Sequence, residues 1–142
     1  MRVVVDASVV VKWVLPGSDR EPHTPQALRL LGGIREGSTE PIQPPHWLAE
    51  VAAVITRLQP EIAEPTLDLL DALDLPVASD LATYRRASRI AASLGHHLFD
   101  TLYHALAVER DAVLVTADER YFRKAHALGS IVLLPQWNVE AG

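Results

Sequence analysis

The sequence of 142 residues contains no cysteine. Disulfide bonds and thiolate metal sites are therefore excluded, and nothing indicates an oxidising compartment. Hydrophobic residues make up 49% of the chain and charged residues 22%, which is the balance of a globular protein. The length suits one domain over residues 1–142 with a core of its own.

Long apolar runs are also missing. No stretch approaches the roughly 18 apolar residues that a membrane-spanning helix needs. The N-terminus does not resemble a signal peptide, because the apolar stretch Val3–Val5 is short and the charged residues Asp6 and Lys12 come soon after it. We therefore expect a cytoplasmic protein with no membrane partner.

The chain lacks an excess of positive charge, since its formal net charge is −5. This charge disfavours a protein that its overall electric field holds on nucleic acid. Acids clustered around bound cations would weaken this exclusion, because the cations offset their charge. A local basic patch is then still able to bind phosphates.

The sequence does contain short runs typical of buried strands. Val3, Val4 and Val5 run directly into Asp6, and such a β-branched run indicates a strand buried on both faces of a parallel sheet. A second strand of this kind is predicted at Ala112–Val115, and a last strand at Ile131–Leu134.

Apolar residues recur at helical spacing between these strands. A first short helix is expected after Ser8, a plausible N-cap, and is expected to end at Pro16-Gly17. Further helices are predicted from Thr24-Pro25 to Gly37, from His46 to Leu58, from Pro65 to Leu75, from Leu81 to Leu94 behind an Asp80 cap, from Leu98 onwards, and from Arg120 to His126 behind an Asp118 cap. Strands alternating with helices predict a three-layer α/β/α sandwich with a central parallel sheet.

Four acids stand at comparable places in this pattern. Asp6 and Asp118 follow strands, and Glu50 lies at the start of a helix that follows a short extended segment. The carboxyl ends of parallel strands share one edge of a sheet, so we expect these three acids to converge. Asp100 lies in the first turn of a helix, but no strand leads into it, and topology alone does not place it.

Clustered carboxylates repel one another, so several must be protonated or a cation must lie between them. Hard oxygen ligands without cysteine favour Mg²⁺ or Mn²⁺ over zinc. Such ions activate water and neutralise the charge that develops on a phosphate, so the pattern points to a metal-dependent phosphodiester or phosphate enzyme. The alternative is that these acids are helix caps and surface charges, because each stands where a cap is expected.

Four pieces of the chain carry a family resemblance. They are Val3-Val4-Val5-Asp6-Ala7-Ser8-Val9, Ala49-Glu50-Val51-Ala52, Phe99-Asp100-Thr101-Leu102-Tyr103-His104-Ala105-Leu106-Ala107 and Leu114-Val115-Thr116-Ala117-Asp118. In this order and at these spacings they resemble PIN-domain ribonucleases, and among these the VapC toxins of bacterial type II toxin–antitoxin systems.

The resemblance implies an endoribonuclease with an acidic Mg²⁺ or Mn²⁺ site. The four acids of that family correspond to Asp6, Glu50, Asp100 and Asp118, which would serve both as catalytic residues and as metal ligands. The hydroxyl residues beside the site correspond to Ser8 and Thr116. The resemblance also implies a cognate antitoxin as partner and a homodimer.

Basic residues near these acids are candidates for binding RNA phosphates. Arg120, Arg123 and Lys124 directly follow Asp118, and Lys12 lies one turn beyond Ser8. Arg85, Arg86 and Arg89 form another basic cluster. For the two clusters, the alternative is a solvated helix face.

Two other functions stay open at this stage. One is a catalytically silent PIN fold that binds RNA or a protein. The other is a phosphoacceptor protein that carries its phosphate on Asp6, although Ser8 stands where such phosphatases usually have a second Asp. The six histidines are interpreted as surface or core residues, because the acids already supply hard ligands.

Overall fold

The computed structural model describes residues 1–15 and 22–137. The strands that it describes form one parallel sheet in the order β2-β1-β3-β4. Their bounds are Arg2–Val5 for β1, Glu40–Pro41 for β2, Val113–Thr116 for β3 and Ile131–Leu133 for β4. Val3, Val4 and Val5 are fully buried, so β1 is an interior strand, as the valine run predicts.

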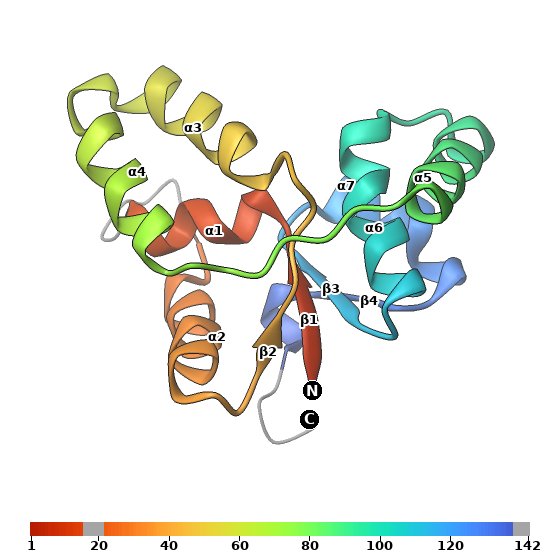
Figure 1. Cartoon of the computed structure of the whole chain (residues 1–142), viewed down its shortest axis with the longest axis horizontal. Coiled ribbons are helices and arrows are strands. Elements are labelled where there is room, and N and C mark those ends of the chain that lie inside the picture. The colour runs from red at the N-terminus through yellow and green to blue at the C-terminus, as the bar shows by residue number, and fades with distance from the viewer. Residues whose placement is uncertain (16–21, 138–142) are drawn as a thin grey trace.

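Helices cover both faces of this sheet, and the predicted three-layer α/β/α sandwich is confirmed. In Figure 1, α1 to α4 lie on one side of the strands and α5 to α7 on the other. The helices are α1 (Ala7–Val14), α2 (Thr24–Glu36), α3 (Trp47–Leu58), α4 (Ala63–Ala72), α5 (Leu81–Leu94), α6 (Leu98–Glu109) and α7 (Glu119–Ala125). Short 3₁₀ turns occur at Pro60–Ile62, His126–Leu128 and Leu134–Gln136.

Helix α6 is the central helix of its layer. It contacts both β1 and β3, and α5 covers its outer side. Every residue from Thr101 to Ala107 is buried, which a single apolar stripe would not achieve. Because α6 is enclosed by the sheet and α5, its N-terminal turn has a fixed position beside the end of β1.

Helix caps agree with the predictions at two of three places. Asp80 and Asp118 accept hydrogen bonds from the backbone N–H groups of Thr83 (2.8 Å) and Tyr121 (3.0 Å). The prediction for α1 is wrong, because its N-cap is Asp6, and Ser8 lies inside the first turn. Asp6 accepts from the Ser8 N–H at 3.3 Å, so the acid itself begins the helix.

Two further expectations concern segments outside regular elements. The sequence around Leu75-Pro76-Val77 predicts a short edge strand, and the structure has a single parallel bridge there, between Gln43 and Val77. The expected helix end at Pro16-Gly17 lies outside the described residues. None of the helices in the described ranges combines the length and the apolar character required to cross a membrane.

Candidate metal centre

Asp6 stands at the exit of β1 and is partly buried. Its Oδ2 accepts hydrogen bonds from the Ser8 hydroxyl and from the Thr116 hydroxyl, the latter at 3.2 Å. The pKa of Asp6 is raised to about 6, chiefly by burial, with the carboxylates of Asp100 and Glu50 adding to the effect and the Ser8 hydrogen bonds opposing it. The chain thus brings three acids close enough to disfavour one another's charge.

The two hydroxyl residues also connect the exits of two neighbouring strands. The Ser8 Oγ accepts a hydrogen bond from the backbone N–H of Ala117 at 3.0 Å. The Thr116 Oγ1 accepts one from the backbone N–H of Asp118 at 3.1 Å. Ser8 and Thr116 therefore lie beside Asp6 and hold the end of β1 against the end of β3.

Glu50 lies in the first turn of α3 and is partly buried. His46 Nε2 is 3.0 Å from Glu50 Oε1, but it is also 2.8 Å from the carbonyl oxygen of Phe99. One N–H group points in one direction only, and the Phe99 carbonyl takes it. Glu50 Oε1 is consequently buried with no hydrogen-bond partner among the described residues.

Asp100 lies in the first turn of α6, the place that topology alone did not give. Its Oδ2 is 2.7 Å from Nε2 of His96, four residues earlier. The side chain of Asp100 is 35% exposed, whereas that of His96 is 10% exposed. The more deeply buried histidine thus binds one oxygen of the Asp100 carboxylate from the side that faces the protein interior.

Tyr103 follows Asp100 by one turn of α6 and is fully buried. Burial raises its pKa, and the carboxylates of Asp6, Glu50 and Asp100 raise it further. The interaction of its hydroxyl with the Glu50 side chain also raises that pKa. Tyr103 therefore lies close to all three acids.

Asp118 takes a different position from the other acids. Its Oδ1 accepts the Tyr121 N–H at the start of α7. The carboxylates that raise the pKa of Asp6 are those of Asp100 and Glu50. Asp118, together with Asp100 and Asp6, raises the pKa of Tyr121 instead. Of the expected convergence of Asp6, Glu50 and Asp118, the structure shows Asp6 and Glu50 acting on each other together with Asp100, and Asp118 acting with Asp6 and Asp100 on Tyr121.

The donor set fits a hard divalent cation, because the acids contribute only carboxylate oxygens, and one buried oxygen lacks a partner in the described chain. As they stand in the described ranges, however, no three Asp, Glu, His or Cys side chains are grouped tightly enough to hold an ion. Carboxylates that repel one another do not close up without a cation between them. Asp6, Glu50 and Asp100 would hold the ion, with Asp118 next to them.

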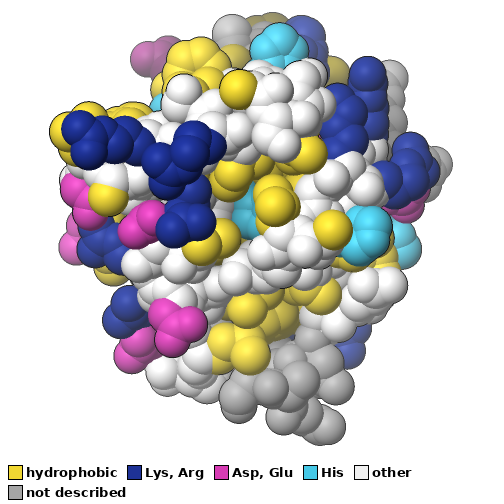
Figure 2. Space-filling model, turned by 90° about the vertical axis from the view of Figure 1, so that its right-hand side faces the viewer, with side chains coloured by type: hydrophobic (Ala, Val, Ile, Leu, Met, Phe, Trp, Pro, Cys, Tyr) yellow, Lys and Arg dark blue, Asp and Glu magenta, His cyan; other side chains and the backbone are white. Residues whose placement is uncertain are grey.

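The basic residues proposed for RNA binding divide into two groups. Arg120 and Arg123 are exposed, and Lys124 is partly buried. Lys12 is only 4% exposed, so its side chain is enclosed by the protein, and its contact with RNA stays a prediction. Figure 2 shows Lys and Arg side chains gathered toward two edges of one face of the molecule, with apolar and uncharged atoms between them.

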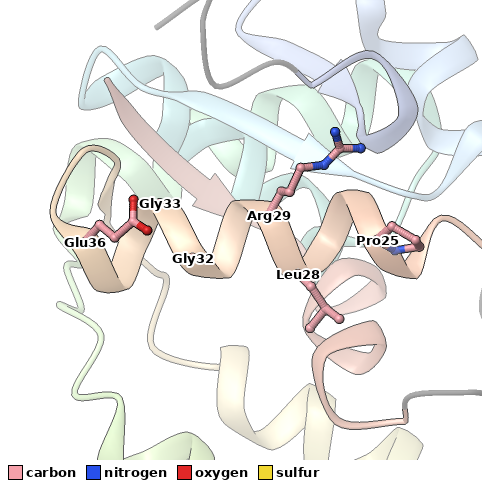
Figure 3. A pocket seen from close by; sticks show the side chains of 6 residues that line it. All are labelled: Pro25, Leu28, Arg29, Gly32, Gly33 and Glu36. Atoms are coloured by element: carbon pink, nitrogen blue, oxygen red, sulfur yellow. The ribbon is translucent and has the colours of Figure 1, made fainter.

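One hollow on the described surface lies away from these acids. It is formed along α2 and is drawn in Figure 3. Its lining residues are Pro25, Leu28, Arg29, Gly32, Gly33 and Glu36. Because it includes none of the four candidate acids, this hollow has no part in the candidate metal centre.

Sequence reasoning missed three side chains of the site, namely His46, His96 and Tyr103. The two histidines precede Glu50 and Asp100 by four residues each, and this repeated spacing was the available signal. Tyr103 lies in the helix predicted from Leu98 onwards, but nothing in the pattern indicates that its hydroxyl lies near the acids.

Comparisons with known proteins agree with this architecture. A family model described as "PIN domain" matches residues 3–127. No curated protein matches the sequence significantly. One similar solved structure is VapBC2 from Rickettsia felis bound to a DNA fragment from its promoter, with a TM-score of 0.67, 16% identity, and coverage of 94% of this chain and 97% of that one. Another is a toxin–antitoxin complex from Klebsiella pneumoniae, with a TM-score of 0.64, 13% identity, and coverage of 93% and 97%.

Proposed function

This chain belongs to the PIN domain family, and on that premise we propose that it is a metal-dependent endoribonuclease of the VapC type. The observation that carries the proposal is the position of Asp6, which lies partly buried at the exit of β1, where the carboxylates of Asp100 and Glu50 act on it. Acids held this close without a cation destabilise the fold, and such an arrangement is typical of a site that binds one.

The roles of the chain's own residues follow from their contacts. Asp6, Glu50 and Asp100 would bind Mg²⁺ or Mn²⁺, with Asp118 beside them, and the ion would supply an activated water and neutralise charge on the scissile phosphate. The hydroxyl groups of Ser8 and Thr116 both donate hydrogen bonds to Oδ2 of Asp6. The hydroxyl residues would thereby fix the carboxylate with one oxygen turned to the ion.

Arg120 and Arg123 would contact the RNA backbone beyond the metal centre. Both are exposed on α7, the helix that begins at Asp118. Guanidinium groups bind phosphate oxygens in pairs of hydrogen bonds, and the resulting affinity falls with salt. On this proposal, the positive charge that the net-acidic chain needs for an RNA substrate comes from these two arginines.

The biological setting belongs to the same proposal. The two similar solved structures contain toxin–antitoxin proteins, one of them bound to promoter DNA. By this likeness, the chain would be a cytoplasmic toxin that forms a homodimer and is silenced by a cognate antitoxin. A small gene for a DNA-binding protein beside its own gene would support this assignment.

The decisive assay compares RNA cleavage by the wild-type protein and by Asp6→Asn in Mg²⁺ or Mn²⁺. We expect the variant to lose at least about 100-fold in rate, because a neutral amide is a poor ligand for a hard cation. Asp68→Asn, an exposed acid on α4, serves as the matched control and should cleave normally. Equal cleavage by wild type and Asp6→Asn would reject the nuclease assignment.

A catalytically silent PIN domain is the second candidate. It is favoured by one observation, namely that the described residues form no preassembled group of three ligands. A titration with Mn²⁺ distinguishes the two functions. If the wild-type protein binds the ion no better than Asp6→Asn does, the domain is catalytically silent.

A further inference from the structure

His96 is held on three sides next to the candidate metal centre. Its Nε2 lies 2.7 Å from Asp100 Oδ2, and its Nδ1 lies 3.3 Å from Nζ of Lys124. The ring also meets the ring of Tyr121 edge to face, with centroids 4.9 Å apart and planes at 60°. Only 10% of the side chain is exposed, so the imidazole has little freedom to turn.

These contacts assign the proton on the imidazole. A lysine ammonium has only donors, so the Nδ1 of His96 must accept the hydrogen bond from Lys124. The proton of a neutral ring then resides on Nε2, where it is donated to the Asp100 carboxylate. Lys124 therefore selects the tautomer that binds Asp100.

The wall behind His96 is fixed by a second histidine. The carbonyl of Gly129 only accepts, so His104 Nε2 donates to it at 2.7 Å. Burial lowers the pKa of His104 and keeps its ring neutral, which leaves Nδ1 to accept from the Tyr121 hydroxyl at 2.9 Å. Tyr121 is thus anchored at its far end, and the ring that supports His96 does not rotate freely.

We infer that His96 is a positioning residue for Asp100: together with Lys124, it occupies Oδ2 of the carboxylate and leaves Oδ1 to a divalent cation. The inference rests on the proposed function, because it needs Asp100 to be a ligand. It assigns Lys124 a role inside the site in place of the RNA contact expected from its sequence position. Hydrogen-bond partners of metal ligands typically contribute 10–100-fold in metal affinity.

The first test measures Mn²⁺ affinity of the purified full-length protein by electron paramagnetic resonance. We expect His96→Ala to weaken binding by about 10–100-fold and His96→Gln to retain most of it, since the glutamine amide offers an N–H near the position of Nε2. Lys124→Met should weaken binding less than His96→Ala does. The controls are His126→Ala and Arg57→Met, which change an exposed histidine and an exposed cation and should bind Mn²⁺ as wild type does.

The second test reads the tautomer directly from the ¹⁵N chemical shifts of the histidine rings. We expect His96 in the wild-type protein to carry its proton on Nε2 alone, and Lys124→Met to populate the other tautomer. A proton on Nδ1 in the wild type would overturn the inference. This measurement does not depend on whether His96→Ala folds, because it uses the intact ring.

Asp100→Asn distinguishes failure of the inference from failure of the proposed function. If wild type and Asp100→Asn bind Mn²⁺ equally, Asp100 is no ligand, and both the metal centre and the inference fall. If Asp100→Asn weakens binding and a folded His96→Ala does not, the metal centre stands and His96 has no positioning role.

Discussion

The side chain of Gln43 pairs with the main chain of Val5 as a neighbouring strand would. Its Oε1 accepts the Val5 N–H at 2.7 Å, and its Nε2 donates to the Val5 carbonyl at 2.9 Å. Strand β2 is only two residues long, so the backbone ladder beside β1 stops before the residue that precedes Asp6. The buried carboxamide completes it and thereby fixes the strand exit that carries Asp6.

Replacing Gln43 with leucine should strongly destabilise the protein. The N–H and C=O of Val5 would both stay buried without partners, and each such group costs roughly 1–3 kcal/mol. We expect urea denaturation to show a loss of about 2–6 kcal/mol in the free energy of unfolding. Gln26→Leu is the matched control, because the Gln26 Oε1 is already buried without a partner in the described chain and its loss should cost little.

Two substitutions of Asp118 should separate its role as the cap of α7 from its electrostatic role in the site. Asn caps helices as well as Asp, so Asp118→Asn should leave the free energy of unfolding within about 0.5 kcal/mol, whereas Asp118→Ala should lower it by about 1 kcal/mol. Both variants should lower RNA cleavage by roughly 10–100-fold, since the carboxylate acts from beside the three closer acids. Normal cleavage by Asp118→Asn would restrict this residue to capping α7.

The buried strands could be predicted because the valine run and the later β-branched runs are short, apolar and typical of strands inside a parallel sheet. The convergence of Asp6 with Glu50 could be expected for the same reason, since parallel strands end at one edge. Asp100 could not be placed, because it arrives on the N-terminal turn of α6, and the position of that turn depends on how the buried helix packs. The packing of a helix enclosed on several sides leaves no periodic signal.

Two other features could not be predicted, each for its own reason. In helix α1, Val9, Val10, Val11 and Lys12 are all buried, and a one-sided apolar pattern does not indicate that a lysine is enclosed with the valines. The pairing of His96 with Asp100 spans the end of a loop and the start of a helix. The four-residue spacing is a signal for such a contact, but it does not predict it firmly at this place, because helical spacing rules hold only inside a helix.

His104 should make the protein less stable in acid. Its pKa is lowered in the folded state by burial, so below the ordinary histidine pKa the unfolded chain binds a proton that the folded chain does not. The free energy of unfolding contributed by this residue is therefore complete at high pH and falls as the pH drops through that value. We expect His104→Gln to show a smaller loss of stability than wild type between about pH 7.5 and pH 5.5, and parallel curves would contradict this account.

Asp6 should have the opposite pH dependence in the metal-free protein. Its folded pKa of about 6 exceeds the ordinary 3.8, so the folded chain binds the proton more tightly. The resulting stability is present below pH 3.8 and is lost as the pH rises to 6, with a cost on the order of 3 kcal/mol above that. Asn avoids this cost and retains an oxygen for the hydrogen bonds from Ser8 and Thr116.

We therefore expect Asp6→Asn to be more stable than wild type at about pH 8 in the presence of a chelator, by up to about 3 kcal/mol, with the difference vanishing near pH 4. Adding Mg²⁺ should raise the melting temperature of the wild-type protein and not that of the variant, because only an ion that binds the folded state shifts the equilibrium. Asp68→Asn should show neither effect. A variant less stable than wild type under these alkaline conditions would mean that the carboxylate contributes more through its hydrogen bonds than it costs through burial and repulsion. In that case the acids do not store the strain that a bound cation would relieve.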